Sequence, residues 1–371
     1  MSKKKLWYKT ARAIIKAGQM PFPVSDTLIE LLQTLITEEE ARFISDVFNR
    51  QPNLNINQIK DATDKPEDEL EDTLSTLMQK GILTGLPSTS TGVMVYRLMP
   101  PFPGIFEFSL MKKSTADTLK RDKKLATLFD TLFKEMSEGT QKNYDNIVPQ
   151  YKNFPPVDRV IPVEKEIDIE QEVVLPSEEV KKVVDKFDNI AVALCYCRHE
   201  KELLGDPCKI DAPRENCLTF GKTARFSIQQ GFAKPISKKE AKDLLNEAEE
   251  HGLVHRAFHI HQNPERDEEA ICSCCKCCCG IFQLFYRGVM PIHTTTSYLA
   301  KLNEDNCIGC GTCTRMCAME AVTLEDDVAV VNKNRCIGCG VCAYHCPEEA
   351  MILDRTGQRN VFVPPPKVEQ T

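Results

Sequence analysis

The sequence that decides the fold of the C-terminal region reads Cys307-Ile-Gly-Cys310-Gly-Thr-Cys313-Thr-Arg-Met-Cys317, and it recurs as Cys336-Ile-Gly-Cys339-Gly-Val-Cys342-Ala-Tyr-His-Cys346-Pro347. Each run has the spacing C-x2-C-x2-C-x3-C, in which three closely spaced thiolates on one tight loop can cap three irons of a cubic iron–sulfur cluster. Glycines within each loop let the backbone curl and direct its N–H groups at sulfur. The repeat therefore predicts two adjacent cluster sites.

The fourth cysteine of each run is expected to reach the other cluster. Cluster one would then use Cys307, Cys310, Cys313 and Cys346, and cluster two would use Cys336, Cys339, Cys342 and Cys317. The alternative is a pair of zinc sites. Zinc ribbons space their paired cysteines differently and rarely repeat four at this interval, so we expect 4Fe-4S clusters.

These two runs resemble the bacterial-type dicluster ferredoxin domain. The resemblance implies low-potential, one-electron transfer between redox partner proteins. Pro347 follows the second run as in that family, whereas Ala318 stands where the first run usually has proline. Ligation is expected to survive this difference, while the local packing and the potential of cluster two are expected to change.

Cysteine is the abnormal component of the composition, with 18 in a chain of 371 residues and none before Cys195. The basic N-terminus contains only a short apolar run, Ala13-Ile14-Ile15, which is too short for the core of a signal peptide. Cytosolic thiols stay reduced, so we expect metal ligation rather than disulfides, in the cytoplasm of an anaerobe. The net charge of -7 predicts no general attraction to nucleic acid or anionic membranes.

Ten cysteines lie upstream of the repeat and form a second metal-binding region: Cys195, Cys197, Cys208, Cys217, Cys272, Cys274, Cys275, Cys277, Cys278 and Cys279. Together with the stretches 215–221 and 235–253, they resemble a cysteine-rich module found ahead of dicluster ferredoxin domains in strict anaerobes. We expect one or two further iron–sulfur clusters, and zinc is the less favoured metal. The preferred first set is Cys195, Cys197, Cys208 and Cys217, and mixing with the knot at 272–280 is the alternative. The knot itself would hold a second cluster, and one iron of that cluster could be open to a substrate.

The sequence of the N-terminal region, residues 1–104, predicts a helical, winged-helix-like interaction domain. Apolar residues recur at helical spacing before Phe48, a helix is expected at 67–80 with Gly81 as its stop, and two strands follow at 82–86 and 93–98. The helix at 67–80 begins with five acidic residues, which would face phosphates if it entered a DNA groove. We therefore favour protein interaction over DNA binding.

The sequence as a whole predicts an α+β protein of several parts. Residues 105–188 would form a helix followed by an extended linker or arm, 189–298 a cysteine-rich α+β middle domain, 299–357 the dicluster ferredoxin domain, and 358–371 a flexible tail. His251, His255, His259 and His261 are close in sequence, but we expect core or surface histidines rather than a metal site.

The resulting hypothesis is an electron-transfer protein, a redox subunit that relays low-potential electrons to or from a partner oxidoreductase. Two alternatives stay open. One is a redox-sensing regulator that acts through the winged-helix-like domain. The other is a reductase whose middle-domain cluster performs the chemistry itself, although an electron carrier is favoured over a self-sufficient enzyme.

Overall fold

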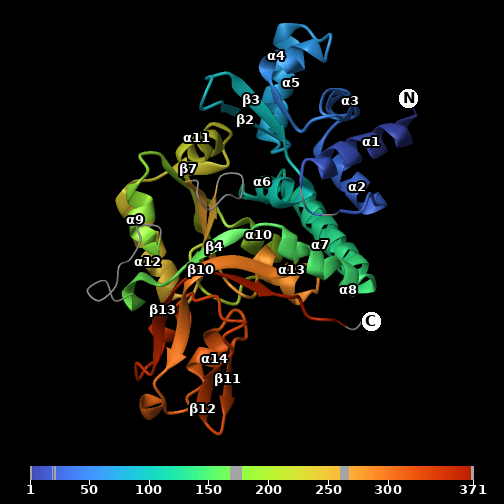
Figure 1. Ribbon diagram of the computed structural model, residues 1–371. Coiled ribbons are helices and arrows are strands. Elements are labelled where there is room, and N and C mark those ends of the chain that lie inside the picture. Colours follow the sequence, from blue (N-terminus) through green and yellow to red (C-terminus); the bar gives the residue numbers. More distant parts are fainter. Residues whose placement is uncertain (1, 19, 21, 168–177, 260–266, 369–371) are drawn as a thin grey trace. The chain divides into compact units, whose positions relative to one another are not determined.

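The computed structural model describes residues 2–18, 20, 22–167, 178–259 and 267–368, and its mixture of helices and strands confirms the α+β class (Figure 1). The chain forms two compact units, each built from separated segments. Unit 1 comprises Met1–Met136, Tyr196–Pro207 and Phe226–Ala233. Unit 2 comprises Ser137–Cys195, Cys208–Arg225 and Lys234–Thr371. The sequence analysis predicts consecutive domains, whereas each of these two units combines segments that lie far apart in the chain.

The N-terminal part of unit 1 contains helices before Phe48, a helix over the segment predicted at 67–80 and the two strands predicted after it, together with a helix at its start and a short strand at 53–55 that the sequence did not predict. A three-stranded antiparallel sheet has the order β1-β3-β2. The elements are α1 (Lys3–Lys16), α2 (Asp26–Leu35), α3 (Glu38–Val47), β1 (Asn53–Asn55), α4 (Ile56–Asp61), α5 (Glu67–Gln79), β2 (Leu83–Pro87) and β3 (Met94–Leu98). The winged-helix likeness of this part stays a prediction.

Local sequence explains where these helices begin and end. Thr37 and Glu40 form a capping box at the start of α3, and Asn55 and Gln58 form one at α4. Helix α5 buries Leu70, Leu74 and Leu77, which lie three to four residues apart on one face. Gly81 follows with a positive φ of 71°, as predicted for its stop.

The remainder of unit 1 is organised around aromatic side chains. After the irregular segment η1 (Pro101–Ile105), helices α6 (Phe106–Leu110), α7 (Leu119–Lys142) and α10 (Tyr196–Leu203) follow. The ring of Phe106 packs edge-on against Phe129 and Phe133, with centroids 4.9 and 5.3 Å apart. Tyr196 of α10 adds a third edge-on contact at 5.6 Å. This packing draws the short segment after Cys195 into unit 1.

Unit 2 is built on an eight-stranded mixed sheet with the order β13-β10-β4-β8-β9-β6-β5-β7. The strands are β4 (Asp158–Ile161), β5 (Ile190–Leu194), β6 (Glu215–Phe220), β7 (Ala233–Pro235), β8 (Val254–His259), β9 (Glu268–Cys274), β10 (Ile292–Leu302) and β13 (Met351–Val363). Strand β4 pairs in parallel with β10 and antiparallel with β8. The segment expected as a linker or arm thus supplies a buried interior strand, and its continuation at 168–177 lies outside the described residues.

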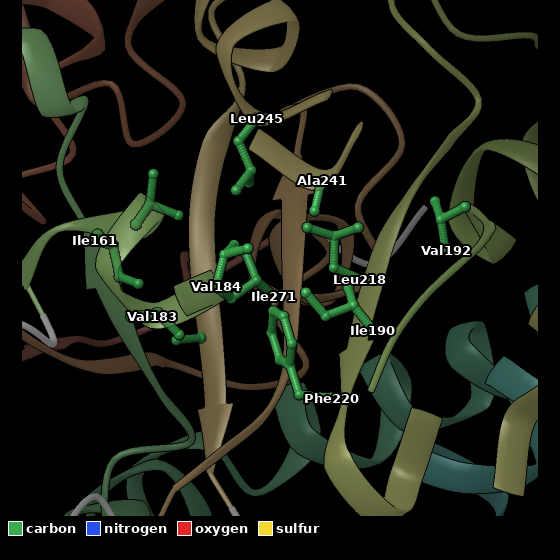
Figure 2. Close-up of a cluster of buried hydrophobic side chains, with 12 residues drawn as sticks. Ile161, Val183, Val184, Ile190, Val192, Leu218, Phe220, Ala241, Leu245 and Ile271 are labelled. Atoms are coloured by element: carbon green, nitrogen blue, oxygen red, sulfur yellow. The ribbon is translucent and has the colours of Figure 1, made fainter. Parts of the chain in front are cut away.

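The helices of this part of the chain are α8 (Tyr144–Ile147), α9 (Val180–Asp185), α11 (Gly221–Gln229), α12 (Lys238–Glu250) and α13 (Gly280–Tyr286), with short 3-10 turns at Val148–Asn153, Glu164–Glu166 and Glu304–Asn306. Helices α9 and α12 pack on one apolar face of the sheet. The capping box predicted for α12 is present, since Ser237 accepts from the Glu240 N–H and Glu240 from the Ser237 N–H. Figure 2 shows Ala241 and Leu245 of α12 facing Leu218 and Ile271 of the sheet. This core fixes β6 and β9, the strands that carry several cysteines.

The C-terminal region is inserted into a long β-ribbon. Strands β10 and β13 pair antiparallel from Ile292↔Val363 to Leu302↔Met351. Between them lie α14 (Thr312–Met316), the hairpin β11 (Val322–Glu325) and β12 (Val328–Val331), and α15 (Val341–Tyr344) (Figure 1). Both ends of the inserted part are therefore continuous with the sheet of unit 2. Within the described ranges, no helix combines the length and the apolarity of a bilayer span.

Candidate functional site

Two cavities in the C-terminal region are each lined by four cysteines. We call Cys307, Cys310, Cys313 and Cys346 the outer quartet, because these line the first cavity. We call Cys317, Cys336, Cys339 and Cys342 the inner quartet, because these line the second. The fourth cysteine of each run thus lies in the cavity of the other run. The sequence assigns the same two sets to clusters one and two, and this assignment stays a prediction.

Glycines make both loops possible. Helices α14 and α15 each start after a left-handed glycine, Gly311 with φ 67° and Gly340 with φ 76°. Gly338 also has a positive φ of 66°, and a Cβ placed there would lie 2.1 Å from the carbonyl oxygen of Tyr298. That distance is far below van der Waals contact, so the loop of the inner quartet tolerates no side chain at this position.

The inner quartet is largely buried and lies against backbone donors. Cys336 and Cys342 are buried, and burial raises the pKa of Cys339 to about 12 and the pKa of Cys342 well above its ordinary value. The Ala321 N–H donates to Cys317 Sγ at 3.2 Å, and the Ala300 N–H to Cys336 Sγ at 3.5 Å. Such N–H donors stabilise thiolates bound to metal and tune cluster potentials. The residues present therefore fit a thiolate-bound iron–sulfur cluster.

The outer quartet lies at the surface. Cys310 is exposed, and the neighbouring side chain of Ile308 is 64% exposed. A hydrogen bond with Thr312 lowers the pKa of the Cys310 thiol. Exposed acidic side chains occupy the same part of the chain: Glu304, Asp305, Glu325, Asp326, Asp327 and Glu348. A cluster at the outer quartet would be accessible to a partner protein. A cluster at the inner quartet would not be.

The inner side of the C-terminal region packs against the cysteine-rich segments of unit 2. The Tyr286 hydroxyl donates to the Ala318 carbonyl oxygen at 2.7 Å, and His345 Nε2 lies 3.2 Å from the Glu249 carbonyl oxygen. Lys276 forms an ion pair with Glu320 at 2.7 Å. Lys276 belongs to the knot and Tyr286 to the helix that follows it, so the knot and the inner quartet belong to one packed region.

Four of the upstream cysteines form a compact quartet, Cys208, Cys275, Cys277 and Cys278, whose Sγ atoms all lie within 4.8 Å of one another. Four of the Sγ–Sγ distances are 3.6 or 3.7 Å. Cys208 therefore joins the knot, which differs from the expected set of Cys195, Cys197, Cys208 and Cys217. The grouping corresponds to the alternative, mixing of the two cysteine groups, and arises because Cys208 lies in the loop that follows α10.

A second buried group, the strand-end thiols, comprises Cys195, Cys217, Cys272, Cys274 and Cys279. Cys217 and Cys272 are direct partners in the β6–β9 register, with Sγ atoms 3.4 Å apart. Hydrogen bonding to Cys195 and Cys272 raises the pKa of Cys217, and hydrogen bonding to Cys279 raises the pKa of Cys274. Cys272 and Cys274 share one side of β9 by strand alternation. Cys197 lies buried on α10 in unit 1.

Sequence reasoning missed Arg256, a fully buried residue of β8 that pairs in register with Cys272. Its Nε donates to a carboxylate oxygen of the equally buried Asp158, and the ring of Phe282 faces its guanidinium at 5.2 Å. Charges on Asp158, Cys279 and Cys274 raise the pKa of the guanidinium against the effect of burial. Its Nη1 and Nη2 atoms lack a hydrogen-bond partner among the described residues. A buried cation thus faces the strand-end thiols.

The histidines have other surroundings. His255 is buried, with Nδ1 3.1 Å from Ser273 Oγ and Nε2 3.5 Å from a carboxylate oxygen of Glu249. His251 caps the C-terminus of α12, and His259 is buried at the end of β8. His261 lies outside the described residues. In the described ranges, these histidines do not join the compact quartet.

Comparison with protein families gives one match. Residues 300–353 match the model of the 4Fe-4S dicluster domain, which supports the resemblance noted for the two cysteine runs. Searches of curated proteins and of solved structures yield no significant match for the chain. The chain therefore contains a 4Fe-4S dicluster domain near its C-terminus, and its cysteines support metal binding and iron–sulfur electron transfer.

Proposed function

We propose that this chain is a redox subunit that relays electrons between a partner protein at the outer quartet and the cysteine-rich part of unit 2. The observation that carries the proposal is the pair of four-cysteine cavities, one at the surface and one packed against the knot. When bound, each 4Fe-4S cluster would supply one-electron redox chemistry. The cysteines would hold the clusters, and the surrounding residues would set their access and potential.

The outer quartet is the proposed docking end. Ile308 and Leu324 offer exposed apolar surface, 64% and 39% exposed respectively, beside the acidic side chains of the surrounding loops. Such a combination favours a partner with a basic rim and an apolar centre, because complementary charge accelerates encounter. The partner would be an oxidoreductase or another electron carrier, and the setting an anaerobic cytoplasm.

The inner quartet is the proposed link to the rest of the protein. Tyr286 follows the knot on α13 and bonds to the residue after Cys317, so a short route of covalent and hydrogen bonds joins the two regions. Because burial excludes water from Cys336 and Cys342, little solvent would have to reorganise around this site when its charge changes. Both features suit electron passage rather than solvent-exposed chemistry.

The strand-end thiols are the proposed third redox centre. Cys272 pairs in register with the buried Arg256, and the charges of Cys274 and Cys279 act on its guanidinium, whose Nη atoms lack hydrogen-bond partners among the described residues. A thiolate-ligated cluster is anionic and accepts hydrogen bonds at sulfur, so it would satisfy this cation.

The same observation supports the second candidate function, a reductase in which this centre acts on a substrate. The regulator is disfavoured because α5, the helix that would face DNA, begins with Glu67, Asp68 and Glu69.

The test is anaerobic purification of the full chain with iron and sulfide analysis and EPR of the reduced protein. The two clusters of the dicluster domain require about eight irons, and a third cluster would raise the count to about twelve. Cys313→Ser and Cys346→Ser should impair the same cluster, while Cys317→Ser should impair the other. A colourless protein that holds only zinc would refute the proposal.

A further inference from the structure

We propose that Cys208, Cys275, Cys277 and Cys278 bind a single tetrahedral Zn²⁺ ion rather than an iron–sulfur cube. This site goes beyond the proposed electron relay, because Zn²⁺ has no redox chemistry in proteins and would serve the architecture. The inference stands on geometry that distinguishes these four thiols from the two quartets of the C-terminal region.

The sulfur separations fit one small ion. With Zn–S bonds of about 2.3 Å, the sulfurs of a tetrahedral site lie about 3.8 Å apart. The observed Sγ–Sγ distances agree: Cys208 lies 3.7 Å from Cys275 and 3.6 Å from Cys277, and Cys277 lies 3.6 Å from both Cys275 and Cys278. All four sulfurs lie within 4.8 Å of one another.

The C-terminal quartets provide an internal comparison. A cube places its irons and sulfides between the four thiolates, and both the outer and the inner quartet surround a cavity. In the compact quartet, by contrast, the four sulfur atoms all lie within 4.8 Å of one another. Among the described residues, no other group of three or more potential ligands is this close. The strand-end thiols also contain a close pair, Cys217 and Cys272, but among the described residues only the compact quartet brings all of its sulfurs together. Four sulfurs this close leave no room for the irons and sulfides of a cube.

The knot forms the site by turning sharply after β9. The Cys279 N–H donates to the Cys275 carbonyl oxygen at 3.1 Å, which closes a turn and lets the adjacent Cys277 and Cys278 face the same point. An extended chain would direct them to opposite sides. Cys274 and Cys279, which flank the turn, belong to the strand-end thiols, so the knot divides its sulfurs between two sites.

The surroundings suit a closed structural site. Ala248 and Leu253 are fully buried beside Cys275 and Cys278, and Ile210 and Ala212 pack on the same cluster. The apolar shell excludes a water ligand, as expected for a structural rather than a catalytic zinc site. The ion would cross-link the loop that carries Cys208 to the knot. This cross-link would hold α13 and Tyr286 in position.

The experiment measures metals in the anaerobically purified full chain and in two variants. We expect one zinc per chain in addition to the iron. Cys208→Ala with Cys277→Ala should remove the zinc and leave the iron content unchanged. The matched control, Cys217→Ala with Cys272→Ala, should leave the zinc in place. Zinc X-ray absorption should report four sulfur neighbours at about 2.3 Å.

Several outcomes would overturn the proposal. Loss of about four irons in the Cys208/Cys277 variant would assign a cube to the site. One iron in place of zinc would overturn the choice of metal. If the variant does not fold, Co²⁺ substitution of the wild-type chain decides, because a tetrahedral Co²⁺–thiolate spectrum is expected and its absence contradicts the site. Failure of these tests leaves the C-terminal iron content untouched, so it is distinguishable from failure of the electron-relay proposal.

Discussion

The hydroxyl group of Tyr286 donates a 2.7 Å hydrogen bond to the backbone carbonyl oxygen of Ala318, the residue that follows Cys317. Tyr286 ends the helix that begins directly after Cys279, so this bond joins the knot to a cysteine of the inner quartet. Ala318 is the position at which the dicluster family usually has proline. The smaller residue is buried here, and the tyrosine bond anchors the backbone at this point.

Tyr286→Phe should therefore slow internal electron transfer while the iron content is unchanged. Loss of a single buried hydrogen bond should also lower the free energy of unfolding by about 1 kcal/mol. The rate is measured by flash reduction of the anaerobic protein, followed in the visible spectrum. Tyr344→Phe is the matched control, because its hydroxyl contacts the side chain of Lys165 in an exposed position. Equal rates in both variants and in the wild type would contradict a route through Tyr286.

The acidic loop between β11 and β12 should govern partner docking. Asp326 and Asp327 both adopt a positive φ, a conformation that asparagine tolerates well, so Asp326→Asn with Asp327→Asn should fold normally. We expect the double variant to associate more slowly with the redox partner and to show a weaker dependence on ionic strength. Stopped-flow kinetics at several salt concentrations measure both. Glu247→Gln on α12 removes an exposed charge elsewhere in unit 2 and should leave the rates unchanged.

Arg256 should be required for both stability and redox potential. Arg256→Gln leaves the buried carboxylate of Asp158 without its cation, which we expect to cost about 3 kcal/mol in the free energy of unfolding. Loss of the positive charge should also make the potential of a cluster at the strand-end thiols more negative, because the more reduced state carries more negative charge. Arg256→Lys keeps the charge and should shift the potential less. Anaerobic redox titration with EPR detection measures the shift, and an unchanged potential in Arg256→Gln would place the cluster elsewhere.

Glu107 should make the stability of unit 1 depend on pH. Burial raises the pKa of this carboxyl from 4.5 to about 7, although the Gly104 N–H donates to it. The folded state therefore binds the proton more tightly than the unfolded state, and stability falls as the pH rises from about 4.5 to 7, by up to about 3 kcal/mol. Glu107→Gln should remove this dependence and be the more stable protein at pH 8. Denaturant unfolding at pH 5 and pH 8 checks this, and parallel curves for both proteins would contradict it.

Local patterns in the sequence predict much of this structure. The fixed spacing of the cysteine runs implies the outer and inner quartets, because neighbours in the chain supply three of the four sulfurs in each. The capping box at Ser237 and the apolar spacing of α5 likewise depend on residues that are close in sequence. Such features need no knowledge of long-range pairing.

Features that depend on contacts between distant parts of the chain could not be predicted from local sequence. Cys208 joins Cys275 only because the fold brings the loop after α10 to the knot, and no local spacing encodes this. Arg256 gives no signal either, because a single arginine beside His255 in a short strand looks like an exposed residue. One pattern does point toward the site: the alternation of Cys272 and Cys274 indicates a shared strand face.

The pairing of Leu302 with Met351 makes the dicluster part an interruption of a hairpin rather than an extension of a chain end. The pairing of the two strands does not require the inserted residues, so joining the strands by a tight turn should yield a shortened protein that keeps this ribbon. The inserted part is less independent, because the Ala300 N–H of β10 donates to Cys336 Sγ, and Tyr286 and Glu249 of the host contact Ala318 and His345. The host hairpin therefore provides part of the surroundings of the inner quartet, and the excised loop alone should not reproduce them.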